Sequence, residues 1–434
     1  MYCFRGFNYC ITEENMQIEL SIQSGAEIKG VVHLVSSKSE SNRLLILRAV
    51  SGLTFDIHNL SEAEDTRTLH RILNEFSAGN NEYVFDVGAA GSTFRFLTAF
   101  FASRNCRVTL TGDQRMKQRP VGELVQALRF LGANIDYLGE EGYPPLQILG
   151  RQLLGGEVSI RADISSQFIS ALMMVAPGFQ NGLTLRFQTD TVSFSYIKLT
   201  ALLMQSCGMK LMFDNRSVRV QSGIHFAEEN EKVFYVSGDW SSASYFYAFA
   251  ALSESAEIKI YGLRKDSGQA DEICAEIFQK LGVDSFFIDE YLLIKKSRPV
   301  ELNYFEFDFK DCPDIAQTVA VVCAAKKIKT RLTGLQTLRK KETDRIAALQ
   351  NELSKFIVDT SVDDNALNID ASDADFINYG IPISTYSDHR MAMSFAPLVL
   401  LTKTLTIESP DVVKKSFPLF WSSLEEIGIK TKIS

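Results

Sequence analysis

The 434-residue sequence lacks the residue clusters from which proteins usually build metal, redox and nucleotide sites. Its seven cysteines form no C-x-x-C pair, and its five histidines never fall within ligand spacing of one another. We therefore expect no protein-built metal site, and cysteines that act as small apolar side chains in a reducing compartment. The absence of G-x-x-x-x-G-K-[ST] and of a strand-led G-x-G-x-x-G argues against nucleotide chemistry of those kinds.

The sequence also lacks long apolar runs and any surplus of cations. No run reaches ~18 residues, the length of a membrane-spanning helix, and residues 1–15 lack the apolar core of a secretory signal. Those residues match nothing that follows, so we expect Met16 to be the true start. With 46% hydrophobic and 23% charged residues, the composition is that of a soluble globular protein. A net charge of −8 argues against a non-specific nucleic-acid binder.

Internal repetition is the strongest architectural signal. The pattern D-x-S-S begins at Asp163 and again at Asp239, and an apolar stretch of helix length follows each copy. Four further segments share a polar loop that leads into an apolar helix: 37–50, 89–102, 312–325 and 387–401. Because these six predicted helices are apolar on nearly every face, we expect them to be buried.

Six other segments are predicted to be amphipathic helices followed by strands. They are 62–76, 122–138, 194–213, 270–288, 341–356 and 417–433. The helix of 122–138 has Pro120 at its first position and ends at Gly132. The alternation predicts an α/β fold of two similar domains, each with three βαβαββ units, buried helices inside and sheets outside.

The sequence also suggests where one domain ends and the other begins. We expect one domain to span 35–237, and a discontinuous domain to combine 1–34 with 238–434. The active site would then lie in the cleft between the two domains.

Cations gather beside the predicted helix starts of this acidic protein. Lys341-Glu342-Thr343-Asp344-Arg345 is predicted to open a helix, on which Lys341 and Arg345 would be neighbours that repel each other. Basic loops also occur at 38–43, 115–119, 388–390 and 414–415. Solvated, salt-bridged helix faces and simple helix caps are the bland alternatives. The recurrence instead favours a cleft in which helix N-termini, Arg and Lys bind a polyanion.

Several of these segments resemble the 5-enolpyruvylshikimate-3-phosphate (EPSP) synthase family, the 3-phosphoshikimate 1-carboxyvinyltransferases. The matching stretches include SKSESNR (37–43), RMKQRPVGELVQAL (115–128), GDWSSASYF (238–246), KKETDRI (340–346) and SDHRMAMSF (387–395). The most specific of them are RMKQRPVGELVQAL, KETDR and DHRMAM. The resemblance implies transfer of the enolpyruvyl group of phosphoenolpyruvate to the 5-hydroxyl of shikimate 3-phosphate, with release of phosphate by addition and elimination. It also implies a cytoplasmic monomer that needs no cofactor.

The resemblance assigns roles to individual residues. Asp314 would be the base that takes the hydroxyl proton, with Lys341 nearby. Glu342 would give a proton to the enol carbon, with Lys38 and His389 as alternatives, and Lys415 would assist. The shikimate 3-phosphate site would comprise Lys38, Ser39, Arg43, Ser165, Ser166, Gln167, Ser193, Tyr196, Asp314, Thr337 and Lys341. The phosphoenolpyruvate site would comprise Lys38, Gly91, Arg119, Gln167, Arg345, Arg390 and Lys415. The alternative for Asp314 is a helix N-cap, and it could serve as both base and cap. For His389, a structural hydrogen-bonding role fits as well as proton transfer.

The sequence departs from the family pattern at several positions. They are Val35, Ser36, Ala89, Ser92, Phe96, Gln114 and Thr337. These changes put in question the substrate affinities and the sensitivity to phosphoenolpyruvate mimics such as glyphosate.

Two other functions remain as alternatives. One is the sister transferase that acts on UDP-N-acetylglucosamine, which carries a reactive cysteine in the loop matching 110–120; no cysteine lies there. The other is a non-catalytic anion-binding relative, against which the retention of charged residues such as Asp314 and Lys415 argues.

Overall fold

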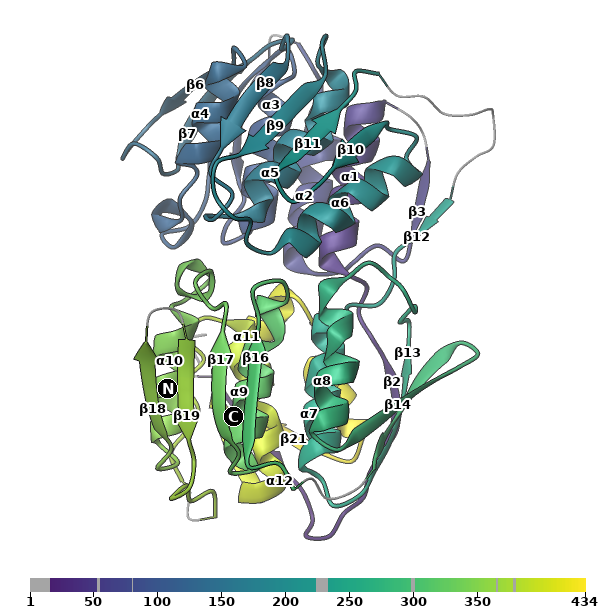
Figure 1. Cartoon of the computed structure of the whole chain (residues 1–434), viewed down its shortest axis with the longest axis vertical. Helices are drawn as coiled ribbons and strands as arrows, with labels where there is room; N and C mark the ends of the chain where they lie inside the picture. Colours follow the sequence, from purple (N-terminus) through teal and green to yellow (C-terminus); the bar gives the residue numbers. More distant parts are fainter. Residues whose placement is uncertain are drawn as a thin grey trace, which may run out of the picture.

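The computed structural model describes residues 16–52, 55–79, 81–223, 233–297, 301–363, 366–377 and 380–434. Residues 1–15, with the question of whether Met16 is the start, lie outside this range, as does His225. The chain forms two lobes stacked along the long axis of the molecule, each with its own apolar core (Figure 1). None of the described helices is both long and apolar enough to cross a membrane.

The six predicted apolar helices form and are buried, three in each lobe. In the first lobe they are α1 (Lys38–Ser51), α3 (Gly91–Ala102) and α5 (Ser166–Val175). In the second lobe they are α7 (Trp240–Leu252), α9 (Ala316–Ala325) and α11 (His389–Phe395). Every residue of α9 is buried, as expected for a helix without a polar face.

The six amphipathic helices also form, on the outside of these bundles. They are α2 (Glu64–Glu75), α4 (Gly122–Phe130), α6 (Phe194–Ser206), α8 (Cys274–Lys280), α10 (Arg345–Ser354) and α13 (Phe420–Glu425). The sequence predicted Pro120 as the first residue of α4, and this is wrong, because the helix begins at Gly122.

The predicted start of the helix at 341–356 is also wrong. The Asp344 side chain accepts hydrogen bonds from the Ile346 and Ala347 amides, so Asp344 caps α10 and the helix begins at Arg345. Lys341 lies before this cap, and it is not a helix neighbour of Arg345.

Three four-stranded sheets have the predicted βαβαββ order. One contains β4 (Glu82–Asp86), β5 (Cys106–Thr111), β7 (Leu146–Gly150) and β6 (Asn134–Tyr137). The second contains β10 (Leu211–Phe213), β11 (Ser217–Val220), β9 (Leu183–Phe187) and β8 (Gly156–Ile160). The third contains β16 (Tyr304–Asp308), β17 (Lys329–Thr333), β19 (Ala366–Asp370) and β18 (Asp359–Asp363). In each, a parallel pair spans a buried helix and an antiparallel hairpin completes the sheet.

The remaining sheets combine strands from distant parts of the chain. β2 (Ile28–His33) pairs in parallel with β13 (Ala256–Tyr261). On its other side β13 pairs antiparallel with β15 (Tyr291–Lys296), which in turn pairs antiparallel with β14 (Val283–Ile288). β1 (Gln17–Ser21) lies between β20 (Thr404–Glu408) and β21 (Lys430–Ile433). A short parallel pair joins β3 (Asp56–His58) to β12 (Val233–Tyr235).

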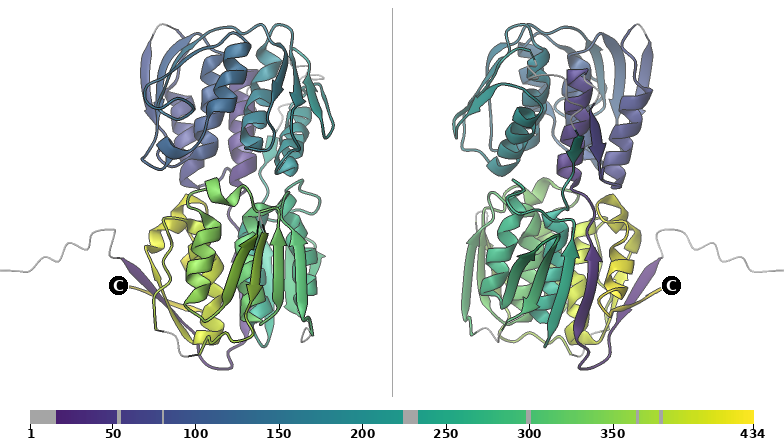
Figure 2. Two further views of the ribbon diagram at one scale, coloured as in Figure 1. Left: turned by 60° about the vertical axis from the view of Figure 1, so that its left-hand side comes forward. Right: turned by 90° about the vertical axis from the view of Figure 1, so that its right-hand side faces the viewer.

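The chain crosses between the lobes twice, and the two crossings lie side by side (Figure 2). The Ser37 amide donates to the Ser237 carbonyl at 2.7 Å. The buried Glu40 carboxylate of α1 accepts from the Ser237 amide at 3.0 Å, from its hydroxyl at 2.6 Å, and from Gln269 Nε2 at 3.1 Å. These bonds fix the lobes to each other on one side of the molecule.

Candidate active site

A cavity of about 120 Å³ lies between the two lobes, where the loops that precede the buried helices of both lobes converge. Nearly all of the site residues predicted from the sequence line it: Lys38, Ser39, Arg43, Gly91, Arg119, Ser165, Ser166, Gln167, Ser193, Tyr196, Asp314, Thr337, Lys341, Glu342, Arg345 and Arg390. Lys415 is not part of this lining, although its neighbour Ser416 is, and its Nζ lies 3.3 Å from Oε1 of the lining residue Glu342. The structure thus brings together residues from separate loops and helix starts of both lobes.

The first lobe supplies helix starts with cations beside them. Ser37 caps α1, so Lys38 stands at the first turn of that helix, where its Nζ lies 3.2 Å from Asp65 Oδ2. Ser165 caps α5 by accepting from the Gln167 amide at 3.3 Å. The cavity therefore meets amide groups at the N-terminal ends of buried helices, which favours anionic ligands.

Arg43 is held by the protein rather than free in the cavity. Its Nε donates to Thr200 Oγ1 at 2.7 Å, and its guanidinium lies 5.4 Å from the Phe96 ring centroid and 5.6 Å from that of Tyr196. Burial lowers the pKa of Arg43 to about 10. Phe96, one of the departures from the family pattern, thus packs against a predicted substrate-binding arginine.

Gly91 and Arg119 touch in a way that leaves no room for another side chain. A Cβ added to Gly91 would stand 2.4 Å from Arg119 Nη1 and 2.6 Å from Cζ. Behind them, the buried Arg95 donates to the Gly91 and Pro120 carbonyls and to Gln167 Oε1, each at 3.0 Å. Burial, and then repulsion from Arg119, lowers the pKa of Arg95 well below its ordinary value.

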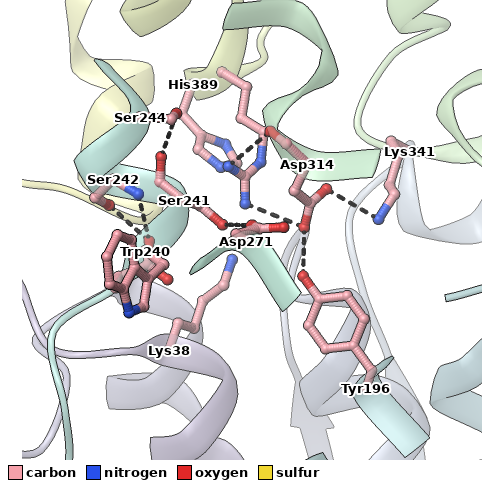
Figure 3. Close-up of polar contacts among 12 residues, drawn as sticks. Lys38, Tyr196, Trp240, Ser241, Ser242, Ser244, Asp271, Asp314, Lys341 and His389 are labelled. Atoms are coloured by element: carbon pink, nitrogen blue, oxygen red, sulfur yellow. Dashed lines mark hydrogen bonds and ion pairs between the residues drawn. The ribbon is translucent and has the colours of Figure 1, made fainter. Parts of the chain in front are cut away.

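Asp314 is the centre of the second-lobe side (Figure 3). Its Oδ1 lies 3.3 Å from Lys341 Nζ and 3.1 Å from Arg345 Nη1, and its Oδ2 lies 3.2 Å from Arg390 Nη2. Burial alone would raise the pKa of Asp314, but these three cations outweigh it and hold that pKa well below its usual value. Asp314 lies in a short 3-10 turn and makes no cap hydrogen bond to α9.

Tyr196 reaches Asp314 from the other lobe. Its hydroxyl donates to Asp314 Oδ2 at 2.9 Å. Burial and then the Asp314 charge raise the pKa of Tyr196 well above its ordinary value, so the phenol keeps its proton. The contact joins a residue of the predicted substrate site to the predicted base.

Glu342 is the second carboxylate of the site. Its Oε2 lies 2.9 Å from Arg345 Nη2, and its Oε1 lies 3.3 Å from Lys415 Nζ. Burial favours the neutral acid, but Lys415 and Arg345 prevail and hold the pKa of Glu342 well below its usual value. Both carboxylates therefore share the fully buried Arg345, which Asp388 also binds at 2.7 Å.

The pKa values of His389 and Lys341 are lowered, which favours the uncharged form of each side chain. Burial, followed by repulsion from Arg390 and Lys38, holds the pKa of His389 well below its ordinary value, so the imidazole is uncharged. Within the described part of the chain, neither of its ring nitrogens has a hydrogen-bond partner. Burial also lowers the pKa of Lys341, more than the neighbouring Asp314 raises it.

Several lining residues had no role in the sequence prediction. Asp65 binds Lys38, and Asp239 and Ser241 come from the second D-x-S-S copy, which was recognised as a repeat and as part of a family match but was given no site role. Close behind the cavity, the buried Asp271 accepts a hydrogen bond from Ser241 (Figure 3). Burial, and then the Asp314 charge, raises the pKa of Asp271 to about 7. Its place at the start of a predicted helix gave no signal of this contact.

Two solved structures illustrate the fold that this chain shares with known proteins. An EPSP synthase from Acinetobacter baumannii matches 96% of this chain and 100% of its own, with a TM-score of 0.74 at 20% identity. The enolpyruvyl transferase NikO from Streptomyces tendae matches 97% of this chain and 99% of its own, with a TM-score of 0.73 at 13% identity. At these identities the likeness shows the fold: the two-domain, inside-out α/β architecture predicted from the sequence.

Sequence comparison identifies the family. A 3-phosphoshikimate 1-carboxyvinyltransferase from Bacteroides fragilis is 41% identical over 95% of this chain and 98% of its own length. A 3-phosphoshikimate 1-carboxyvinyltransferase from Shewanella halifaxensis is 33% identical over 94% of this chain and 99% of its own length. The sequence model of the EPSP synthase (3-phosphoshikimate 1-carboxyvinyltransferase) family matches residues 70–424.

The chain therefore belongs to the EPSP synthase family. It is an enzyme that transfers the enolpyruvyl group of phosphoenolpyruvate to the 5-hydroxyl of shikimate 3-phosphate, releasing phosphate, in aromatic amino acid biosynthesis. The family and reaction predicted from the sequence are confirmed, and neither alternative function keeps its support.

Proposed function

We propose that the interdomain cavity is the active site of this reaction and that the residues divide as the family resemblance implies. Shikimate 3-phosphate would lie against the first-domain helix starts, and phosphoenolpyruvate between Arg119 and the second-domain cations. The observation that carries the proposal is the pair of carboxylates, Asp314 and Glu342, held on either side of Arg345. A reaction that removes a proton from a hydroxyl and adds one to a carbon needs two such groups.

Asp314 is suited to take the hydroxyl proton once the substrates are bound. The three cations alone hold its pKa so low that it would be a weak base. Phosphate and carboxylate groups of the substrates would offset those cations, and the pKa of Asp314 would rise. The 5-hydroxyl oxygen then attacks C2 of phosphoenolpyruvate as its proton passes to Asp314, with Lys341 and Tyr196 holding the carboxylate in place.

Glu342 would supply the proton that C3 of the enol gains in the same addition. For this it must first become protonated, although Lys415 and Arg345 hold its pKa well below its usual value. Phosphoenolpyruvate would compete for both cations, which would raise the pKa of Glu342. In the elimination, the tetrahedral intermediate returns a C3 proton to the site, the C2–C3 double bond re-forms and phosphate leaves.

The assignment of the base is tested with Asp314→Asn, which keeps the shape of the side chain and an acceptor for Tyr196. We expect turnover to fall ~10²–10⁴-fold, the usual contribution of a positioned acid or base. Affinity for shikimate 3-phosphate should be unchanged or tighter, because a negative charge leaves a cationic cleft. Asp363→Asn, which removes the exposed partner of Arg331 in the same domain, is the matched control and should behave as wild type.

Turnover is measured as the release of inorganic phosphate when shikimate 3-phosphate and phosphoenolpyruvate are both supplied. Calorimetry measures the affinity for shikimate 3-phosphate. Should Asp314→Asn turn over at a near-normal rate, Asp314 is not the base. Should the wild type release no phosphate with this substrate pair, the function itself is refuted.

We also propose domain limits of 35–237 for one domain, and of 1–34 with 238–434 for the other. The separate apolar cores, one of which combines residues 18–34 with residues beyond 240, support these limits. We propose further that the enzyme is a cytoplasmic monomer that needs no cofactor. Light scattering on the protein as it elutes from a sizing column tests whether it is a monomer. Retention of full activity after dialysis against a chelator tests whether it needs no metal cofactor.

A further inference from the structure

The start of helix α6 has no cap of its own. Ser193, at the N-cap position, has a left-handed backbone (φ 53°, ψ 47°), and its side chain makes no cap hydrogen bond. The first amides of α6 lie beside the second domain, at the domain boundary. Because a helix start without acceptors is costly to bury, these amides need partners from elsewhere.

The second domain supplies these partners through the loop that leads to Asp314. The Asp311 carboxylate accepts from the Phe194 amide at 3.0 Å, and its backbone carbonyl accepts from the Ser195 hydroxyl at 2.6 Å. The Lys310 carbonyl accepts from the Ser193 amide at 3.0 Å. Asp311 thus does for α6 what an N-cap residue normally does from within its own chain segment.

The acceptor loop is fixed within its own domain. The Asp308 carboxylate accepts from the Lys310 amide at 3.0 Å, and the Phe309 amide donates to the Thr333 carbonyl at 2.9 Å. A loop held in this way presents Asp311 at one defined position. Any separation of the two domains at this contact would therefore remove the acceptors at 310–311 from α6 together.

Both partners of this contact also carry residues of the proposed site. Three residues into α6, Tyr196 donates to Asp314, which follows Asp311 by three residues. Capping of α6 and contact of Tyr196 with Asp314 are therefore made or broken together.

We propose that Asp311 is a positioning residue that caps α6 from the opposite domain and thereby couples domain closure to the placement of Tyr196 against Asp314. This inference rests on the proposed function, because shikimate 3-phosphate in the proposed site would contact residues of both domains, such as Lys38 and Lys341, and would thereby favour their closure. Asp311 itself is exposed, and it is not among the residues that line the cavity. Its effect should appear in the equilibrium between separated and closed domains.

Three variants test the proposal. Asp311→Ala removes the cap, and Asp311→Asn retains it without the charge, since Asn caps helices as well as Asp. Asp214→Ala is the matched control, because Asp214 is an exposed carboxylate that accepts from the Arg216 and Ser217 amides, both at 2.7 Å, within one domain.

Calorimetry gives the Kd for shikimate 3-phosphate, and small-angle scattering gives the ligand concentration at half-compaction. Asp311→Ala should raise the Kd and the half-compaction concentration by ~2- to 30-fold, the range that corresponds to loss of an N-cap. Asp311→Asn should stay within about twofold of wild type, as cap exchange between these two residues allows. Asp214→Ala should leave both values unchanged. The melting temperature of ligand-free Asp311→Ala should fall no further than that of Asp214→Ala, because the cap forms only on closure.

The proposal is overturned if Asp311→Ala binds and compacts like wild type, or if it lowers only the ligand-free melting temperature. It is equally overturned if Asp311→Asn is as weak as Asp311→Ala, since charge would then matter rather than capping. A wild-type protein that fails to bind shikimate 3-phosphate would refute the proposed function instead.

Discussion

A single methyl group at Gly91 should disable phosphoenolpyruvate binding while it leaves shikimate 3-phosphate binding intact. The Cβ of Gly91→Ala would stand 2.4 Å from Arg119 Nη1, whereas non-bonded heavy atoms prefer separations of about 3.5–4.0 Å. Arg119 must therefore retreat by about 1 Å. Misplacement of a substrate-positioning group by about 1 Å can cost about 10²-fold. We expect the KM for phosphoenolpyruvate to rise by that order, because Arg119 is assigned to that substrate.

Steady-state kinetics with phosphoenolpyruvate as the varied substrate, together with calorimetry for shikimate 3-phosphate, would measure the two effects separately. Gly178→Ala is the control, because nothing lies within 4 Å of a Cβ at that position. In an Arg119→Ala background the added methyl group meets no guanidinium, so Gly91→Ala should then have little further effect. If Gly91→Ala keeps the wild-type KM, or is equally harmful in that background, displacement of Arg119 is not the mechanism.

Two further predictions concern buried charges. Asp271 keeps a proton up to about pH 7, whereas in the unfolded chain it loses this proton near its ordinary pKa. The free energy of unfolding should therefore fall as pH rises between those two values. Asp271→Asn should show a smaller loss of melting temperature between pH 5 and pH 8 than wild type, and an equal loss would contradict the burial argument. Lys415→Ala should raise the KM for phosphoenolpyruvate and also slow turnover, because it removes the cation that binds Glu342 at 3.3 Å; kinetics in which only turnover falls would place Lys415 outside that substrate's site.

The architecture could be predicted from the sequence because its signals are local. A helix without a polar face, such as 316–325, is stable in water only when it is buried. Amphipathic helices then pack their apolar faces against such buried helices and expose their polar faces to solvent. Capping was less certain, because Asp and Ser both cap well. In the first D-x-S-S copy Ser165 caps the helix, whereas in the second copy Asp239 does. The same motif therefore meets its helix at two different positions.

The electrostatics of the site could not be predicted in this way. Lys341 and Arg345 were expected to repel each other as helix neighbours, but both contact Asp314 instead. That carboxylate lies some thirty residues away in sequence, so the pairing depends on how two loops meet in the folded domain. The same holds for Asp271 and Asp311, whose partners lie on other elements or in the other domain. Motif resemblance indicated which residues gather, and the fold determines which of them share a charge.

The parallel pairing of β2 with β13 has a consequence for the order of folding during synthesis. Ile28 pairs with Ala256, so the whole chain segment of the first lobe is made between the two strands. A pairing so distant in sequence forms slowly, because loop closure costs entropy before any contact is gained. The first lobe, whose three buried helices and two complete sheets are contiguous, can fold on the ribosome while β1 and β2 still wait for partners. The N-terminal strands should then be the part of the nascent chain most in need of protection from aggregation.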